Sequence, residues 1–238
     1  MIVTASGLTR SYGQGEATVH ALAGVDVAFP TGAFTAIMGP SGSGKSTLMH
    51  LLAGLDRPTS GSVVLAGTEL ADLGDKELTA LRRDKVGFIF QSFNLLPVLT
   101  AEENILLPLS IAGRRPDQAW LDRLIDTIGL RDRLGHRPAE LSGGQQQRVA
   151  VARALASQPA VVFADEPTGN LDSKTSTEVL ELLRLSVDEF GQTIVMVTHD
   201  ARAAGYADRL IELEDGLIVR DGAPAQTNTA TLAGSRGL

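Results

Sequence analysis

Apolar and polar positions along the chain follow two patterns, one typical of strands and one typical of helices. Continuous apolar runs predict buried strands, and they occupy residues 34–38, 86–90, 160–164 and 193–197. Alternating or shorter runs predict further strands at residues 2–8, 25–29, 61–65, 209–213 and 217–220. Helical spacing predicts helices at residues 45–52, 75–83, 146–157 and 173–190. We therefore expect an α/β protein with a mainly parallel core sheet.

Helical spacing without intervening strands marks the middle of the chain. Thr100 and Glu103 have the form of a capping box, which opens a helix toward Pro108. A second, amphipathic helix is predicted at residues 117–128. Because the strand and helix alternation resumes afterwards, we expect a helical subdomain inserted at about residues 95–140.

One glycine-rich segment between a predicted strand and a predicted helix carries the most specific chemistry. Its sequence, GPSGSGKST, satisfies the phosphate-binding P-loop pattern GxxxxGK[ST]. Glycines let backbone N–H groups turn onto a phosphate, and the following helix directs its positive dipole end to the same place. Lys45 can reach β- and γ-phosphate oxygens, and the Ser46 hydroxyl is a hard ligand suited to Mg²⁺. The predicted triphosphate site comprises Gly39, Pro40, Ser41, Gly42, Ser43, Gly44, Lys45, Ser46 and Thr47.

Polar residues close three of the buried runs, where ligands bind in open α/β sheets. Asp165 is positioned to support Mg²⁺, and Glu166 to orient or deprotonate an attacking water. Gln91 could meet a metal ion or a water, and His199 a γ-phosphate. Each has a plainer alternative, since strand-end acids can simply be solvated, an amide can cap a loop, and a lone histidine is often structural.

Two further segments are less specific when taken alone. Residues 141–145 read LSGGQ and lead into a predicted helix, with Ser142 as N-cap and bare amides at Gly143 and Gly144. By itself, such a glycine pair indicates only a turn. Tyr12 lies in a predicted loop at residues 11–15, where its ring could stack on adenine or simply pack.

Composition limits the functions that these motifs can serve. The chain has 238 residues, and we expect residues 1–222 to form one domain and residues 223–238 a loose tail. A net charge of −7 argues against a surface that neutralises nucleic acid. The absence of cysteine excludes disulfides and thiolate metal sites. With no long apolar window and no secretory signal, we expect a cytoplasmic protein that can dock on a membrane partner.

Together, and in this order, the motifs resemble those of the nucleotide-binding domain of ABC transporters. The resemblance covers residues 2–222, and LSGGQ is its most specific part because other P-loop proteins lack it. Residues 88–107 and 165–172 look most like the MacB/LolD-type branch of macrolide and peptide exporters, lipoprotein-release ATPases and a cell-division relative. The resemblance implies the ABC ATPase fold, with an N-terminal antiparallel β subdomain and an inserted helical subdomain.

The resemblance also implies a role for each motif. Tyr12 would contact the adenine, and the P-loop would bind the phosphates. The implied catalytic residues are Lys45, Gln91, Glu166 and His199, and the implied Mg²⁺ ligands are Ser46, Gln91 and Asp165. A D-loop of Asn170, Leu171 and Asp172 would link two sites. The signature residues Leu141, Ser142, Gly143, Gly144 and Gln145 would act in trans, on ATP bound to a second copy.

The implied partners are a second copy, arranged head to tail, and an integral-membrane permease of the MacB/FtsX-like type. ATP and Mg²⁺ are the implied cofactors, and the expected location is the inner face of the membrane. The permease contact is expected at residues 91–98, where Phe93, Leu95, Leu96 and Val98 offer an apolar groove or, alternatively, pack within the helical subdomain. A soluble ABC ATPase acting on nucleic acid or ribosomes is the alternative function. LSGGQ disfavours a P-loop kinase or G protein, and the cargo remains open.

Overall fold

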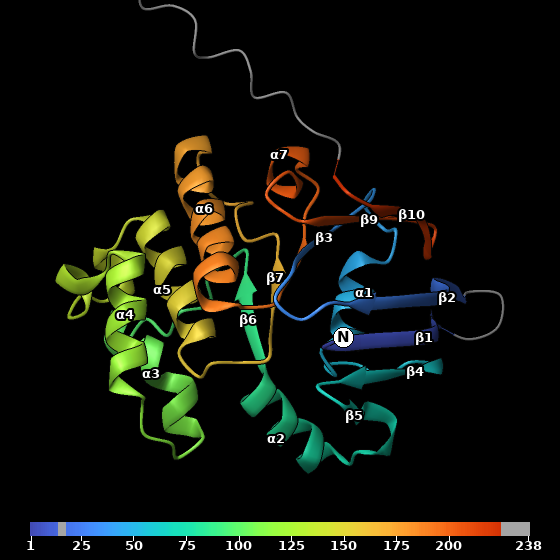
Figure 1. Ribbon diagram of the computed structural model, residues 1–238, viewed down its shortest axis with the longest axis horizontal. Helices are drawn as coiled ribbons and strands as arrows, with labels where there is room; N and C mark the ends of the chain where they lie inside the picture. Colours follow the sequence, from blue (N-terminus) through green and yellow to red (C-terminus); the bar gives the residue numbers. More distant parts are fainter. Residues whose placement is uncertain (14–17, 225–238) are drawn as a thin grey trace, which may run out of the picture.

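Two β-sheets form the scaffold of the protein, whose computed structural model describes residues 1–13 and 18–224 (Figure 1). Among these residues, the antiparallel sheet has the order β2-β1-β4-β5 and the larger sheet the order β10-β9-β3-β8-β7-β6. The antiparallel sheet comprises β1 (Val3–Tyr12), β2 (Val19–Phe29), β4 (Ser60–Leu65) and β5 (Thr68–Glu69). The larger one comprises β3 (Phe34–Met38), β6 (Val86–Phe90), β7 (Val161–Asp165), β8 (Ile194–Val197), β9 (Arg209–Glu214) and β10 (Leu217–Gly222). Its strand pairs are parallel except for β9 with β10, which confirms the mainly parallel core sheet.

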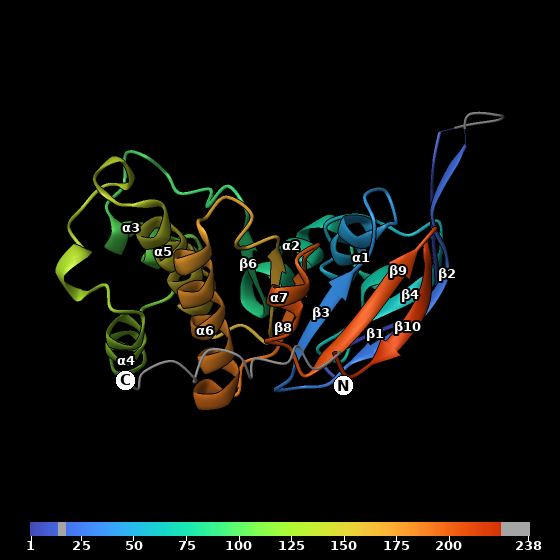
Figure 2. The ribbon, with the colours of Figure 1, turned by 90° about the horizontal axis from the view of Figure 1, so that it is seen from above.

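Four of the helices, α3 to α6, gather at the end of the molecule opposite the antiparallel sheet, whereas α1 lies beside that sheet (Figures 1 and 2). The helices are α1 (Lys45–Leu52), α2 (Asp75–Lys85), α3 (Ala101–Ile111), α4 (Gln118–Ile128), α5 (Gly143–Leu155), α6 (Ser173–Phe190) and α7 (Ala201–Ala204). Within the described residues, short 3₁₀ helices occupy Leu70–Asp72, Arg131–Arg133 and Pro138–Glu140. The expected insertion therefore carries α3, α4 and two 3₁₀ turns. None of the helices in the described ranges has the length and apolar character needed to cross a lipid bilayer.

The larger sheet separates two hydrophobic clusters. Alternate residues of its central strands face opposite sides, so that Phe34 packs with the helical end and Ile37 packs with α1 and the antiparallel sheet. Central strands are therefore buried on both faces, as their continuous apolar runs predict. β6 differs because it forms the edge of the sheet, and its Phe88 and Phe90 are only partly buried.

Strand register brings the ends of four strands to one level. Ile37 pairs with Val197, Val197 with Asp165, and Asp165 with Phe90. The chain therefore leaves β3, β8, β7 and β6 along a single edge of the sheet. This edge carries the start of the P-loop and the polar residues that follow the other strands.

Some boundaries differ from the sequence prediction. Residues 11 and 12 continue β1 rather than starting a loop, because Ser11 and Tyr12 pair with His20 and Val19. The helix predicted from residue 146 begins at Gly143, and α3 continues past Pro108. Residues 14–15 of the predicted loop and residues 225–238 of the predicted tail lie outside the described residues.

Candidate active site

The segment between β3 and α1 forms most of a pocket of about 440 Å³. One residue of β2 and the segments that follow β7 and β8 complete its wall. The lining residues are Ala21, Gly39, Ser41, Gly42, Gly44, Lys45, Ser46, Thr47, Glu166 and His199. The structure thus brings most of the predicted P-loop residues together with Glu166 and His199. Pro40 and Ser43 belong to the same loop, and Ser43 is buried behind this wall.

Two P-loop glycines are required by close backbone approaches as well as by their conformation. Gly44 has φ 100°, and a Cβ atom there would collide with the carbonyl oxygen of Ala21 on β2. Gly39 has φ 152°, and its Cβ would collide with the carbonyl oxygen of Leu213 on β9. Ala21 was not singled out in the sequence, because nothing in a strand of small residues marks which carbonyl will reach the loop.

The turn between β9 and β10 supports the loop from behind. Asp215 and Gly216 have φ 47° and 74°, as a two-residue hairpin turn requires. The Gly216 N–H donates to the Ser43 carbonyl at 3.1 Å, and the Gly216 carbonyl accepts from the Ala23 N–H at 3.0 Å. The C-terminal hairpin, β2 and the P-loop are therefore fastened at one point.

The Lys45 ammonium group is hydrogen-bonded to main-chain carbonyls of the P-loop. Its Nζ donates to the Gly39 carbonyl at 2.9 Å and to the Pro40 carbonyl at 2.7 Å, and the residue is only 9% exposed. Neutral carbonyl oxygens are weaker partners for an ammonium group than phosphate oxygens. Triphosphate can therefore replace them without moving the lysine far.

Glu166 and His199 meet across the mouth of the pocket. The His199 Nδ1 lies 3.0 Å from Glu166 Oε1, and the Glu166 N–H donates to the Val197 carbonyl at 2.9 Å. Glu166 has φ 44°, in the left-handed region, where a non-glycine residue costs on the order of 1–3 kcal/mol. The register of β7 and β8 imposes this conformation, which directs the carboxylate into the pocket.

Asp165 is half-buried immediately before Glu166. Burial raises the pKa of Asp165 above its ordinary value, with Glu166 adding to the rise while His50 and Lys45 oppose it. Within the described ranges, no cluster of three or more His, Cys, Asp or Glu could hold a metal ion by itself. The Asp165 carboxylate and the Ser46 hydroxyl nonetheless fit Mg²⁺, which prefers oxygen ligands and is usually bound through one or two carboxylates together with substrate phosphates.

Gln91 points away from the pocket toward the loop before α6. Its Nε2 donates to Asn170 Oδ1 at 3.2 Å, and Asn170 Nδ2 donates to the Gln91 carbonyl at 3.1 Å. Of the described residues that line the pocket, none is Tyr12, Gln91 or Asp165. Tyr12 instead donates its hydroxyl to Asp56 Oδ2 at 3.1 Å.

The LSGGQ segment lies at the start of α5 and does not line the pocket of its own chain. Ser142 caps the helix, accepting from the Gln145 N–H at 3.3 Å while its own N–H donates to Gln145 Oε1 at 2.9 Å. Gly143 is exposed, and Leu141 is buried. The start of α5 is capped by Ser142 and has no side chain at Gly143. It therefore lies outside the pocket in which its own chain would bind phosphates.

The D-loop ends at a second capped helix. Asp172 Oδ1 accepts the N–H groups of Lys174 and Thr175, both at 3.0 Å. A hydrogen bond from the Thr175 hydroxyl, aided by these backbone donors, lowers the pKa of Asp172 below its ordinary value. The α6 cap is therefore a carboxylate that stays ionised, in contrast to the neutral serine cap of α5.

Gln147 is a connecting residue that the sequence analysis missed. It is fully buried, and its Nε2 donates to the Pro167 carbonyl at 2.5 Å and to the Phe90 carbonyl at 3.4 Å. These two carbonyls lie beside Glu166 and Gln91 respectively. The signature helix is thereby tied to two strand ends of the site, and only the position of Gln147 two residues after LSGGQ could have drawn attention to it.

Fold and pocket together define a P-loop protein that binds nucleotide phosphates at the carboxyl edge of a parallel sheet. Residues 22–169, more than half of the chain, match the ABC transporter family. The chain therefore belongs to the ABC transporter family and is one of its ATP-hydrolysing cassettes.

Relatives agree with this assignment. The chain is 50% identical over 216 residues to the lipoprotein-releasing system ATP-binding protein LolD of Geobacter metallireducens, covering 90% of this chain and 96% of that protein. It is 50% identical over 222 residues to the macrolide export ATP-binding/permease protein MacB of Marinobacter nauticus, covering 92% of this chain. The chain spans about a third of the length of the MacB proteins that it matches.

A solved structure shares the whole fold. The ATP-binding cassette MJ0796, in a dimeric post-hydrolysis state bound to ADP and Pi, superposes with a TM-score of 0.82 at 43% identity. The match covers 94% of this chain and 99% of that chain. The similar protein of that name comes from Methanocaldococcus jannaschii. This likeness confirms the predicted ABC ATPase fold.

Proposed function

We propose that two copies of this chain, arranged head to tail, enclose and hydrolyse ATP between them. One observation carries this proposal: the pocket of one chain has a P-loop, Glu166 and His199 but no residue of LSGGQ, whose Ser142 and Gly143 are exposed on the same chain. A γ-phosphate bound in this pocket would be left open on one side. The bare amides of a second copy can close that side, and in a twofold pair both sites are completed together.

The dimeric relative supports this arrangement. MJ0796 is 43% identical to this chain and was solved as a dimer bound to ADP and Pi. ADP and Pi are the products of ATP hydrolysis. Relatives named as transporter proteins also speak against the alternative of a soluble ATPase acting on nucleic acid or ribosomes.

Catalysis then follows from groups that the chain already holds in place. Lys45 exchanges its two carbonyl partners for β- and γ-phosphate oxygens, and the P-loop amides bind the remaining ones. Glu166 orients the attacking water and accepts its proton, while His199, held by Glu166, contacts the γ-phosphate. Ser46, Asp165 and Gln91 would hold Mg²⁺, which neutralises charge that develops on the phosphates.

The hydrogen bonds between Gln91 and the D-loop would change when nucleotide binds at this site. In the described structure, Gln91 is bonded to Asn170 rather than turned into the pocket. Turning toward Mg²⁺ requires that this bond break, so nucleotide binding would leave Asn170 held only by the Gln91 carbonyl and would loosen the loop that leads to Asp172. That coupling would join the two sites of a dimer through their D-loops.

Residues 91–98 are the proposed contact with a permease of the MacB/FtsX-like type. Val98 is 71% exposed and Leu96 is 43% exposed. The buried Asn104 holds the segment rigid, since its side chain bonds both the N–H and the carbonyl of Leu96, at 2.8 and 3.2 Å. A rigid apolar segment beside Gln91 suits a helix of a membrane partner, which would keep the chain at the inner face of the membrane.

Mixing two inactive variants tests the head-to-tail site. Lys45→Ala removes the phosphate contact, and Gly143→Ala puts a methyl group into the amide surface that the partner would present. Each variant alone should release phosphate from ATP at no more than about a hundredth of the wild-type rate. In a mixed pair, the intact P-loop of one chain meets the intact signature of the other, so activity should return to about a quarter of the wild-type level.

Two results would speak against the proposal. If the mixture stayed inactive although both variants formed mixed pairs with ATP, the site would be complete within one chain or would not use LSGGQ. If Lys45→Ala kept the wild-type affinity for ATP, the assignment of the P-loop as the phosphate site would fail. Phosphate release and equilibrium sedimentation on the mixture test the first case, and calorimetric titration of Lys45→Ala with ATP tests the second.

A further inference from the structure

Tyr12, the proposed adenine contact, is held by two charged side chains of its own chain. The Arg10 guanidinium lies over the Tyr12 ring, with its Cζ 4.5 Å from the ring centroid. The Tyr12 hydroxyl donates to Asp56 Oδ2 at 3.1 Å. Arg10 Nη2 lies 3.0 Å from both oxygens of the same carboxylate. Each of the three side chains therefore contacts the other two.

The burial of Arg10 indicates that its contact with the Tyr12 ring matters, and that Arg10 and Asp56 are more than an ion pair on the surface. Its side chain is 24% exposed, and its Nε is buried without a hydrogen-bond partner among the described residues. An N–H group that is buried without a partner costs free energy. An exposed ion pair would leave that group in water. The cation–π contact with Tyr12 is the interaction that offsets this cost.

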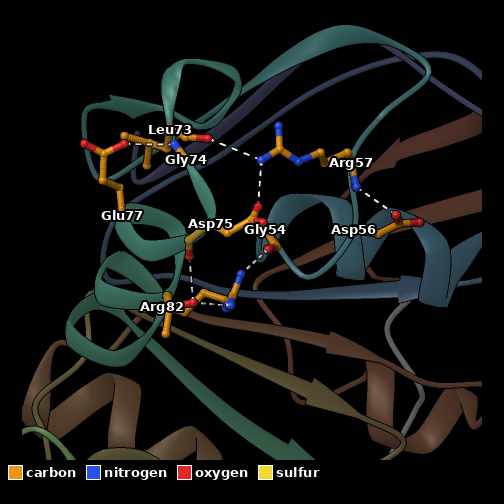
Figure 3. A network of polar contacts seen from close by, with 9 residues as sticks. Gly54, Asp56, Arg57, Leu73, Gly74, Asp75, Glu77 and Arg82 are labelled. Atoms are coloured by element: carbon orange, nitrogen blue, oxygen red, sulfur yellow. Dashed lines mark hydrogen bonds and ion pairs between the residues drawn. The ribbon is translucent and has the colours of Figure 1, made fainter.

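Asp56 is itself fixed by the loop that follows the P-loop helix (Figure 3). The Arg57 N–H donates to Asp56 Oδ1 at 2.8 Å, and the Arg57 side chain reaches Asp75 at 3.0 Å. Arg82 donates to the Gly54 carbonyl at 2.7 Å. The loop is thus anchored to α2 on two sides, so that the Asp56 carboxylate offers Tyr12 a fixed acceptor.

The group of Arg10, Tyr12 and Asp56 lies beside the phosphate pocket. Arg10 pairs with Leu22 across the antiparallel sheet, and the Leu22 Cδ2 lies 3.0 Å from the position of a Cβ at Gly44. Tyr12 remains 42% exposed although Arg10 covers one face of its ring. The exposed part of the ring leaves surface on which a planar base can stack.

We propose that Arg10 and Asp56 are positioning residues, which hold the Tyr12 ring in the plane on which adenine stacks. This inference rests on the proposed binding of ATP, and it takes Tyr12 as the adenine contact that the family resemblance implies. A ring that is already held loses little conformational freedom when the base binds. Because Arg10 and Asp56 act through Tyr12, they should affect recognition of the base and leave recognition of the phosphates unchanged.

Calorimetric titration of the full chain with ATP and with inorganic tripolyphosphate tests this inference. Tyr12→Ala should raise the Kd for ATP roughly tenfold, because stacking on a base is lost. Asp56→Ala and Arg10→Gln should raise it roughly three- to fivefold, because the ring is free to move. Arg10→Lys, which keeps a cation over the ring, should restore most of the affinity. The Kd for tripolyphosphate should stay at the wild-type value in all four variants.

Steady-state kinetics and a matched control complete the experiment. Asp56→Ala and Arg10→Gln should raise KM for ATP and leave kcat unchanged, and Asp56→Ala should add nothing in a Tyr12→Ala background. Asp126→Asn breaks the exposed ion pair with Arg131 on the helical end and should change neither Kd.

Three outcomes would overturn the inference. Wild-type ATP affinity in Asp56→Ala and Arg10→Gln, together with a weakened Tyr12→Ala, would remove the positioning role and leave the adenine contact standing. Weakened tripolyphosphate binding would locate the effect in the P-loop instead. Wild-type ATP affinity in Tyr12→Ala would remove the adenine contact as well, while the mixed-variant test of the head-to-tail site would still stand.

Discussion

The P-loop and the LSGGQ segment are both glycine-rich helix starts, but their surroundings are opposite. The P-loop is enclosed by its own chain, with β2 against Gly44, a hairpin behind Ser43 and Lys45 bonded to loop carbonyls. Gly143 is exposed, and a Cβ there would lie 3.5 Å from Leu171 Cδ2, an ordinary contact distance. The fold of the chain itself therefore requires Gly44 but does not require Gly143. Gly143 is therefore the glycine of this pair at which a contact outside the chain can be tested without disturbing the fold.

The largest expected effect on activity comes from substituting Glu166, which lies in the pocket that the chain itself encloses. Glu166→Gln keeps the size of the side chain and removes the base, so kcat should fall by about 10²- to 10⁴-fold while ATP still binds. The variant should accumulate as an ATP-bound dimer, measured by light scattering after gel filtration. Normal phosphate release by this variant would show that another group activates the water.

Gly143→Ala tests the role of the LSGGQ segment directly. Because the isolated chain has room for this methyl group, its thermal stability and its ATP affinity should not change. Turnover should fall roughly a hundredfold, as expected when one backbone donor to the transition state is displaced.

Gly144→Ala is the matched control for that experiment. Its Cβ would collide with Thr175 Cγ2 on α6, so this variant should lose stability even without nucleotide. Equal effects of Gly143→Ala and Gly144→Ala on the stability of the nucleotide-free chain would contradict the distinction between them.

Val98→Asp tests the other proposed external contact of the helical end. Val98 is 71% exposed, so a charge there should leave the fold and the basal ATPase rate unchanged. Co-purification with the permease from detergent extracts should be lost. Val219→Asp, at another exposed valine on β10, is the control, and an equal loss in both variants would exclude a specific contact at Val98.

Gln147→Met tests the connection between the two regions. The substitution keeps the volume and removes the donor to the Pro167 and Phe90 carbonyls, so the chain should lose about 1–2 kcal/mol of stability in urea. Gln146→Met, at a partly exposed neighbour, should cost less. A greater loss for Gln146→Met would show that Gln147 does not serve as the connection.

The smallest effect concerns the two helix caps. The folded pKa of Asp172 is lowered, so its stabilising contribution is complete above the ordinary aspartate pKa of about 3.9 and is lost as the pH falls through the lower folded value. Asp172→Ser should therefore flatten the acid side of the stability profile, measured as urea midpoints between about pH 7 and 3. Ser142→Asp should add acid sensitivity at α5. Parallel profiles for wild type and Asp172→Ser would contradict the assigned cap.

Local patterns predicted the elements of this protein well, because their causes are local. The apolar runs of β3, β7 and β8 lie in the core as expected, and Thr100, Asp117 and Ser142 cap the helices that follow them. The P-loop, Glu166 and His199 could be placed at one edge because the carboxyl ends of parallel strands share an edge.

Contacts between distant segments could not be predicted in the same way. No local signal showed that Gln91 would bond Asn170, that Ala21 would limit the P-loop, or that Tyr12 would extend a strand and meet Asp56. Each depends on strand register and on the close approach of segments far apart in the sequence. These are properties of the assembled sheet rather than of any short window.

The hairpin turn between β9 and β10 supports the P-loop but is synthesised much later than the loop itself. β3 pairs with β8 and β9, and Gly216 bonds Ser43, so the central strand acquires its neighbours only from the last third of the sequence. During translation, the nascent chain carries the P-loop for about 170 residues without these supports, a long-range closure of the kind that folds late. ATP can therefore bind the finished P-loop only after residues 194–216 have been synthesised.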